Sequence, residues 1–256
     1  MTATTEVHAG ARPRAVLPAA FALLAYLVFN AVVLYCIAFL AGIVVPRTVD
    51  SGGAHAGTAA AVVIDVLLVT LFAMHHSVLA RPAVKRRWTR IVPQHLERSS
   101  YVLVASLLFA LTFWQWRPIP HVLWHVHMTA PRIALWTLFA IGWAVVFAMT
   151  FAIDHFDLVG LRQVTRHVRG VLPTSPAFRV PLPYRLVRHP MMTGFFIAFL
   201  ATPVMTAGHL LFALLNCGYI LIAVRFEERD LSAALPEYRD YAARTPRFVP
   251  RPRRRA

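Results

Sequence analysis

The chain has 256 residues, of which 58% are hydrophobic and only 14% are charged. This balance excludes an ordinary soluble domain, in which about a quarter of the residues carry a charge. The formal net charge is +15, but the basic residues stand in short stretches between long apolar runs. We therefore expect the anionic surface of a lipid bilayer to be their partner, and we expect no binding to nucleic acid.

Long apolar segments dominate the chain. Each of the first four approaches or exceeds the roughly 20 residues that a membrane-spanning helix needs, and they cover 18–45, 59–80, 99–116 and 132–153. A fifth stretch, 191–224, is interrupted near Pro203 and Gly208. We expect a hairpin of two helices there, the first short or tilted, with a re-entrant loop as the alternative. The sequence thus predicts an all-α, polytopic transmembrane bundle of about six helices, or five plus a re-entrant hairpin, in one membrane domain spanning 1–256.

The distribution of Arg and Lys predicts the orientation of this bundle. If the N-terminus is cytosolic, the cytosolic segments hold 23 of the 26 basic residues, and these segments are 1–17, 81–98, 154–190 and 225–256. Basic residues concentrate on the cytosolic side of membrane proteins. We therefore expect both termini in the cytosol and the protein in the inner (cell) membrane of a bacterium. The last residues, 251–256, are predicted to form a disordered basic tail attracted to lipid.

The run Arg188-His189-Pro190, followed by Gly194, begins the last hairpin. Proline suits the first turn of a helix, and the free N–H groups of a helix start attract anions. Arg188 could clamp a carboxylate, and Gly194 would let a flat ligand approach the backbone. The structural alternative is that Arg188 reaches to the membrane surface, while His189 and Pro190 only start the helix.

A second polar group, Glu227-Glu228, ends the same hairpin and is followed by Tyr238, Tyr241 and Arg247. A helical hairpin brings its two ends to the same face of the membrane, so the pair of glutamates should lie near the Arg-His-Pro run. Acidic residues at the edge of a bilayer suggest a functional site. They could accept hydrogen bonds from a ribose or an ammonium group, or they could form a salt bridge to Arg188 or Arg225.

These motifs are similar to those of a known enzyme group. Residues 185–250, which include RLVRHPMMTGFF and VRFEERDL, resemble the C-terminal half of the isoprenylcysteine carboxyl methyltransferase and phospholipid methyltransferase superfamily. Blocks in 76–118 and the stretch HFDL at 155–158 are similar to its methanethiol S-methyltransferase branch, which is close to NnrU-type proteins. The resemblance covers about 60–250. Met192 departs from it, because the superfamily motif usually has Tyr at that position.

The resemblance implies an S-adenosylmethionine-dependent S-methyltransferase (EC 2.1.1) that converts a small thiol, most simply methanethiol, to dimethyl sulfide. The cofactor S-adenosyl-L-methionine would bind in the C-terminal half, about 154–250, facing the cytosol. By position in the motifs, its binding residues would be Arg188, His189, Gly194, Glu227, Glu228, Tyr238, Tyr241 and Arg247. The base that takes the thiol proton would be His155, Asp157 or His76. No metal ion is expected.

Other readings of the sequence stay open. A haem-binding NnrU-like or carotene-isomerase-like protein would use two of His75, His76 and His209, although haem has no use for the two glutamates. A methyltransferase could act instead on a lipid or on a prenylated thiol or carboxyl group. Two weaker possibilities are a di-iron oxygenase using His121, His125 and His127, and a membrane scaffold without enzymatic activity. Asp65, inside the second apolar segment, suggests pairing or a pocket.

Overall fold

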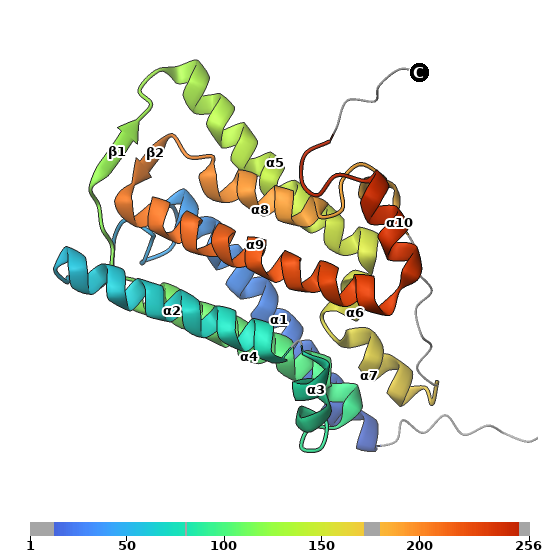
Figure 1. Cartoon of the computed structure of the whole chain (residues 1–256). Coiled ribbons are helices and arrows are strands. Elements are labelled where there is room, and N and C mark those ends of the chain that lie inside the picture. The colour runs from blue at the N-terminus through green and yellow to red at the C-terminus, as the bar shows by residue number, and fades with distance from the viewer. Residues whose placement is uncertain (1–12, 80, 172–179, 251–256) are drawn as a thin grey trace, which may run out of the picture.

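The fold was analysed in a computed structural model that describes residues 13–79, 81–171 and 180–250 (Figure 1). Its helices are α1 (Pro13–Ala41), α2 (Thr58–Leu79), α3 (Pro82–Trp88), η1 (Gln94–Leu96), α4 (Glu97–Gln115), α5 (Thr129–Ile153), α6 (His155–Leu158), α7 (Leu161–Val168), η2 (Leu182–Arg185), α8 (Pro190–Leu200), α9 (Ala207–Ala234) and α10 (Pro236–Arg244). Its two strands are β1 (Val122–His125) and β2 (Val204–Thr206). The basic tail predicted at 251–256 lies outside the described residues.

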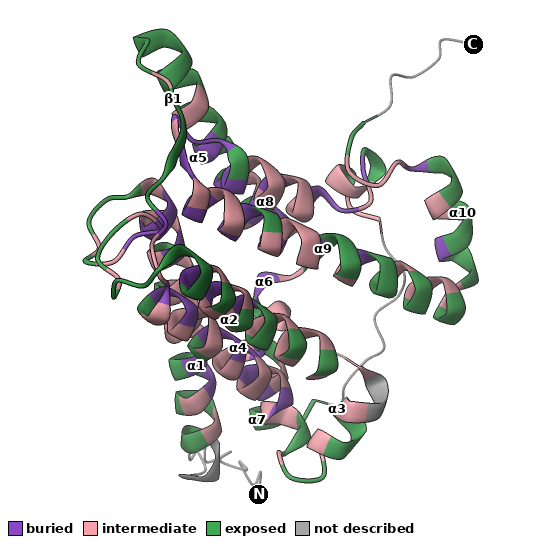
Figure 2. Cartoon of the chain, turned by 60° about the vertical axis from the view of Figure 1, so that its left-hand side comes forward, coloured by how far each residue is buried: buried purple, intermediate pink, exposed green. Residues whose placement is uncertain are grey.

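Five helices are long and apolar enough to cross a membrane: Val16–Ala41, Thr58–Leu79, Gln94–Gln115, Thr129–Ile153 and Ala207–Ala234. The prediction of an all-α polytopic membrane bundle is confirmed. Figure 2 shows many exposed residues on the outward faces of these helices. Among the exposed residues are large apolar ones, such as Leu34 on α1 and Leu67 on α2. Such surfaces suit lipid, because hydrocarbon chains impose no penalty on apolar contact.

The predicted hairpin at 191–224 consists of the 11-residue α8 and the 28-residue α9. At 1.5 Å per residue α8 extends about 16 Å, which is shorter than the hydrocarbon core of a bilayer. The chain continues from α8 in extended form into β2, which pairs with β1. The amides of Val126 and Ala207 donate to the carbonyls of Pro203 and His121, each at 2.8 Å. The first helix is therefore short, as expected, and strand pairing satisfies backbone groups beyond its end.

The end of the bundle that carries β1 and β2 is held together by an aromatic core and by hydrogen bonds that two aspartates accept. Phe39, Trp116 and Phe212 pack together with ring centroids 5.5–6.1 Å apart. Asp65, for which pairing or a pocket was expected, accepts a hydrogen bond from the amide of Arg117 at 2.9 Å. Asp50 accepts one from the hydroxyl of Thr206 next to the start of α9. These bonds tie the loop at 116–128 to α2 and the loop at 42–57 to β2.

Helices α5 and α8 lie side by side and approach closely at two glycines (Figure 1). A Cβ atom added to Gly142 would stand 2.7 Å from the amide nitrogen of Ala198 and 2.8 Å from the carbonyl oxygen of Gly194. A Cβ added to Gly194 would meet the carbonyl oxygen of Gly142 at 2.8 Å. Small residues of this kind permit close backbone contact between helices in membranes. The contact sets the position of α8, whose first turn carries the Arg-His-Pro motif.

We predict that Gly142→Ala destabilises the folded protein by about 1–3 kcal/mol, because the methyl group overpacks this contact. The measurement is thermal stability of the purified protein in detergent, followed by size-exclusion chromatography. Gly218→Ala in α9 is the matched control, since nothing lies within 4 Å of an added Cβ there. That control should be neutral or slightly stabilising, as alanine favours helices. Equal stability of the two variants would contradict this account of α5 and α8.

Candidate active site

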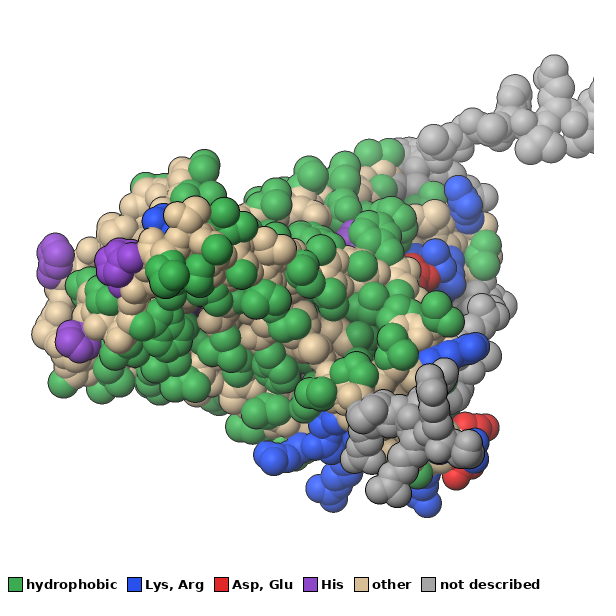
Figure 3. All heavy atoms as spheres, turned by 90° about the horizontal axis from the view of Figure 1, so that it is seen from above, with side chains coloured by type: hydrophobic (Ala, Val, Ile, Leu, Met, Phe, Trp, Pro, Cys, Tyr) green, Lys and Arg blue, Asp and Glu red, His purple; other side chains and the backbone are tan. Residues whose placement is uncertain are grey.

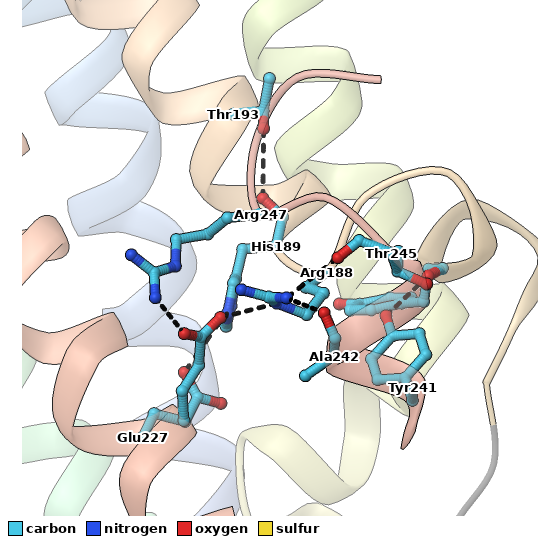
Figure 4. Close-up of polar contacts among 10 residues, drawn as sticks. Arg188, His189, Thr193, Glu227, Tyr241, Ala242, Thr245 and Arg247 are labelled. Atoms are coloured by element: carbon cyan, nitrogen blue, oxygen red, sulfur yellow. Dashed lines mark hydrogen bonds and ion pairs between the residues drawn. The ribbon is translucent and has the colours of Figure 1, made fainter. Parts of the chain in front are cut away.

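A buried ionic cluster joins the start of α8, α9 and the segment after α10 (Figure 4). At its centre is Glu228, whose side chain is 12% exposed. One carboxylate oxygen accepts hydrogen bonds from Arg188 Nε at 2.8 Å and from His189 Nε2 at 3.0 Å. The other accepts from Arg247 at 2.5 Å. We call these four residues the Glu228 cluster. The hydrogen bond to Glu228 raises the pKa of Arg247, so its guanidinium stays charged.

Backbone bonds hold the same elements together. The amides of Arg188 and His189 donate to the carbonyls of Pro246 and Arg247 at 2.8 and 3.1 Å. Arg188 also donates to the carbonyls of Ala242 and Thr245, so its charge lies at the C-terminal end of α10, where a cation is favoured. Pro190 occupies the first turn of α8, where its missing N–H leaves nothing unpaired. The structural reading of the motif is thus correct for Pro190, while Arg188 holds three chain segments in place.

Beside the cluster lies a cavity of about 340 Å³. Its polar lining comes from Tyr184, Arg188, His189, Glu227, Tyr238 and Tyr241, and its apolar lining comes from Ile153, Val180, Met191, Met192 and Leu231. The volume lies within the range of small-molecule sites, and a mostly apolar wall with a few polar groups is usual for them.

The two neighbouring glutamates have different surroundings. Glu228 is enclosed by its three basic partners, whereas the side chain of Glu227 lines the cavity and is 55% exposed. Within the described part of the chain, the basic atom found within 4.0 Å of the Glu227 carboxylate is Nδ1 of His189, at 3.9 Å, which exceeds hydrogen-bonding distance. Successive residues on a helix point about 100° apart, so one carboxylate can bind the protein while the next faces a ligand.

Three tyrosines line the cavity as neutral phenols. Burial raises the pKa of Tyr238 to about 12. Burial, and secondarily the charge of Glu227, raises the pKa of Tyr184. The hydroxyl of Tyr241 donates to the carbonyl of Tyr184 at 2.6 Å, which ties α10 to η2. The cavity therefore presents phenol rings and the Glu227 carboxylate, which attract cations, together with Arg188, which attracts anions.

Comparison with known proteins supports the grouping suggested by the motifs. The chain is 53% identical to methanethiol S-methyltransferase of Mycobacterium tuberculosis, over 90% of this chain and 94% of that protein. It is 49% identical to methanethiol S-methyltransferase 1 of Bradyrhizobium diazoefficiens and 48% identical to methanethiol S-methyltransferase 2 of the same organism. Those matches cover 90% of this chain, and 81% and 89% of the two relatives.

The chain belongs to the methanethiol S-methyltransferase family. It is therefore an enzyme that transfers a methyl group, and the reaction requires a methyl donor. No protein-family model matches the chain, and no solved structure matches it.

The structure brings together most of the residues predicted to bind the cofactor. Arg188, His189, Glu227, Tyr238 and Tyr241 line the cavity. Glu228 and Arg247 belong to the adjoining cluster. Gly194 is not among the lining residues, and its close neighbours are the backbone and side chains of α5. The structure gives this glycine a packing role, so the proposed approach of a flat ligand there stays a prediction.

The three predicted bases lie at separate places and do not line the cavity. His155 begins α6 and is buried. Asp157, also in α6, lies 3.9 Å from Arg166. His76, on α2, packs between Tyr101 and Tyr219, with ring centroids 5.2 and 6.1 Å away. Which of them takes the thiol proton stays a prediction.

In the part of the chain that the structure describes, the histidines considered for a haem do not form one group, and of those considered for a di-iron centre His125 and His127 lie together, with ring centroids 3.9 Å apart. His209 lies at the start of α9 and bonds to the carbonyl of Phe199 at 3.0 Å. His75 and His76 lie in the last turns of α2, which ends at Leu79. Among the described residues, no group of three or more His, Cys, Asp or Glu side chains is arranged to hold a metal ion.

Sequence reasoning did not single out Tyr184, Met191 or Leu231 as lining residues. Tyr184 stands four residues before Arg188 in a proline-rich loop, and this proximity to the motif was the available signal. Leu231 is four residues after Glu227 and shares its face of α9, which the helical repeat would indicate. Met191 gave no signal, because an apolar residue in an apolar helix has no distinguishing pattern.

We predict that Glu228→Ala destabilises the protein by about 3–5 kcal/mol and abolishes activity, because it leaves the largely buried Arg188 without its carboxylate partner. Asp230→Ala on the same helix is the control. Asp230 makes an exposed contact of 3.7 Å with Arg81, and such pairs contribute at most about 1 kcal/mol. Thermal unfolding in detergent measures both variants. A wild-type melting temperature for Glu228→Ala would show that the cluster is not structural.

The raised pKa of Tyr238 predicts a pH dependence at alkaline pH. Since the phenol ionises near pH 10 in the unfolded chain and near 12 in the folded one, its contribution to stability is full below pH 10 and is lost as the pH rises through 12. The shift corresponds to about 2–3 kcal/mol. Tyr238→Phe should therefore lose less stability than the wild type between about pH 10 and 12. Parallel curves of melting temperature against pH would contradict this.

Proposed function

We propose that this chain transfers the methyl group of S-adenosyl-L-methionine to a small thiol, methanethiol in the simplest case, and releases dimethyl sulfide. Methanethiol is the substrate in the names of the relatives described above. The observation that carries the proposal is the cavity at the ends of α8, α9 and α10, where the Glu227 carboxylate and three tyrosines form one wall. The C-terminal half of the chain, about 154–250, would supply the cofactor site.

The cavity residues suit the chemical groups of S-adenosyl-L-methionine. Glu227 can accept hydrogen bonds from ribose hydroxyls or from an ammonium group, since none of the described residues forms a hydrogen bond with its carboxylate. The phenols of Tyr184, Tyr238 and Tyr241 offer hydrogen-bonding groups, and their ring faces attract a positive charge. The cofactor, when bound, supplies a methyl group on a positively charged sulfonium sulfur.

The apolar wall explains how the chain can promote the reaction with few acid–base groups. Ile153, Met191, Met192 and Leu231 make one side of the cavity unfavourable for water. A displacement at a methyl carbon depends on holding thiol and donor in line and on stripping water from the attacking sulfur. Positive and negative charges combine during this step, so a site of low polarity does not oppose it. A small apolar thiol can also reach such a site through the lipid.

The charge distribution supports a cytosolic site in the inner membrane of a bacterium. Figure 3 shows most of the visible Lys and Arg side chains toward the end of the molecule that carries α10, while exposed histidines gather at the end that carries β1 and β2. The Glu228 cluster and the cavity belong to the basic end. Basic residues stay on the cytosolic side during insertion.

The proposal predicts that membranes containing this protein form dimethyl sulfide from methanethiol and S-adenosyl-L-methionine. Headspace gas chromatography measures the product. Glu227→Gln removes the charge but little volume, so we expect at least a tenfold loss in kcat/KM with an unchanged melting temperature. The double variant Glu227→Ala with His189→Ala should be inactive. Asp230→Asn, an exposed acid three residues away on α9, is the matched control and should keep wild-type activity.

The outcomes of this experiment are distinct. Failure of folded wild-type protein to form dimethyl sulfide would exclude methanethiol as the substrate. A Soret band in that same sample would favour the haem-binding alternative. Full activity of Glu227→Gln would keep the reaction but move the cofactor site away from this cavity.

A further inference from the structure

His155 is the centre of a buried hydrogen-bonded chain that links α1 to α5. Its ring is 5% exposed and stacks on Phe151, with centroids 4.4 Å apart. Nε2 lies 3.1 Å from the hydroxyl of Tyr26, and Nδ1 lies 2.9 Å from the hydroxyl of Thr150. Both nitrogens of the ring are therefore engaged, and the ring is held between two hydroxyl groups.

A further hydrogen bond, from Thr150 to a backbone carbonyl, decides which ring nitrogen of His155 carries the proton. The hydroxyl of Thr150 donates its one hydrogen to the carbonyl of Phe147 at 2.7 Å, so toward His155 it can act as an acceptor. Nδ1 of His155 must then donate, which leaves Nε2 with a free electron pair. That pair accepts the O–H of Tyr26. Burial also lowers the pKa of His155, against the opposing charge of Asp154, so the ring is neutral at pH 7.

The hydrogen-bonded side chains run from α5, near a residue that lines the cavity, to α1. Thr150 and Ile153 are one helical turn apart on α5, and Ile153 lines the cavity. Tyr26 is half-buried on α1, and its neighbours Leu23 and Leu27 are 51% and 56% exposed. Leu23 and Leu27 thus place this part of α1 on the apolar surface, from which a thiol dissolved in the bilayer would approach Tyr26.

Few other ionisable groups bear on His155. Asp154, which precedes it, forms an ion pair with Arg162 of α7. Asp157 of α6 lies 3.9 Å from Arg166, which also belongs to α7. Toward α1 and α5 the groups in contact are the hydroxyls of Tyr26 and Thr150. The acidic side chains are thus matched to arginines, and the electron pair on Nε2 is reached through Tyr26.

We propose that Tyr26 and His155 form a proton relay that ionises the thiol, with Thr150 as the positioning residue. The thiol S–H bond breaks and its proton goes to the oxygen of Tyr26, while the phenol proton goes to Nε2 of His155. The resulting thiolate sulfur bonds to the methyl carbon as the bond from that carbon to the donor sulfur breaks, and the donor sulfur keeps the electron pair and becomes neutral. The imidazolium later releases its proton to water. This inference rests on the proposed function and assigns the base.

The test is the pH profile of kcat/KM for methanethiol in reconstituted protein. Tyr26→Phe removes one oxygen and should lower kcat/KM at pH 7 by about 100-fold, the range of general base catalysis. The deficit should shrink as the pH rises, because the thiol then ionises without help. Tyr35→Phe is the matched control on the same helix. Its hydroxyl contacts the carbonyl of Arg47 at the opposite end of the bundle, and its profile should be unchanged.

Thr150 supplies a second, independent variant. Thr150→Val keeps the shape but frees Nδ1 from its acceptor, so we expect a tenfold loss at pH 7 and a shifted acidic limb. Thr150→Ser keeps the hydroxyl and should restore both the rate at pH 7 and the acidic limb. If the methyl group of Thr150 mattered only for packing, Thr150→Ser would restore neither. Binding of labelled S-adenosyl-L-methionine, measured by equilibrium dialysis, should be the same for all four variants and the wild type.

The outcomes separate this relay from the proposed function. Wild-type rates and pH profiles for folded Tyr26→Phe or Thr150→Val would overturn the relay and leave the methyl transfer intact. Loss of cofactor binding in Tyr26→Phe would also overturn it, since the effect would then be on the cavity. If the wild type itself forms no dimethyl sulfide, the proposed function fails and the relay falls with it.

Discussion

The carboxylate of Glu228 must be neutralised where it stands, because a charge that is largely removed from water is costly unless it is paired and hydrogen-bonded. Its partners come from two other segments of the chain, Arg188 and His189 before α8 and Arg247 after α10. Meeting this one requirement fixes three chain segments relative to one another. The C-terminal segment also packs against the first turn of α8, where Thr193 donates to the carbonyl of Phe248 at 2.9 Å. The cavity lies beside these segments, and the ion pairs set the positions of the residues that line it.

The cavity then depends on a difference between adjacent residues. Glu228 is bonded within the protein, whereas Glu227 lines the cavity and has no hydrogen-bonding partner among the residues that the structure describes. A site that retained both carboxylates without basic partners would carry two like charges and would be hard to desolvate. Because Glu228 is paired with Arg188 and Arg247, Glu227 is the acidic side chain that lines the cavity, beside three phenols and Arg188. The carboxylate and the ring faces can attract a cationic group of a ligand, while the remaining lining is mostly apolar.

Different interactions hold the chain segments together at the two ends of the bundle. Around α10 the elements are joined by the ion pairs of Glu228 with Arg188 and Arg247. Around β1 and β2 they are joined by backbone pairing, by Trp116 donating to the carbonyl of Val49, and by aromatic packing. The short α8 requires this, since backbone groups within a bilayer must bond inside the protein. The strand after α8 pairs with β1, so its backbone groups are bonded inside the protein although α8 is short.

The sequence by itself determined the class of the protein and the location of its site along the chain. Apolar segments of spanning length can fold only as helices in lipid, and the charge pattern and motifs placed Arg188, His189 and Glu227 at one end of a hairpin. Tertiary structure decided the rest. Sequence could not say that Glu228 is enclosed while Glu227 is open, because the difference depends on the direction of each side chain relative to α8. Sequence also could not show that Gly194 packs against Gly142 and does not line the cavity, since this contact joins two helices that are distant in sequence. Nor could it mark Tyr26, one apolar-helix residue among many, because its bond to His155 arises from the approach of α1 to the end of α5. Periodicity and charge act along the chain, whereas these contacts depend on which faces meet in space.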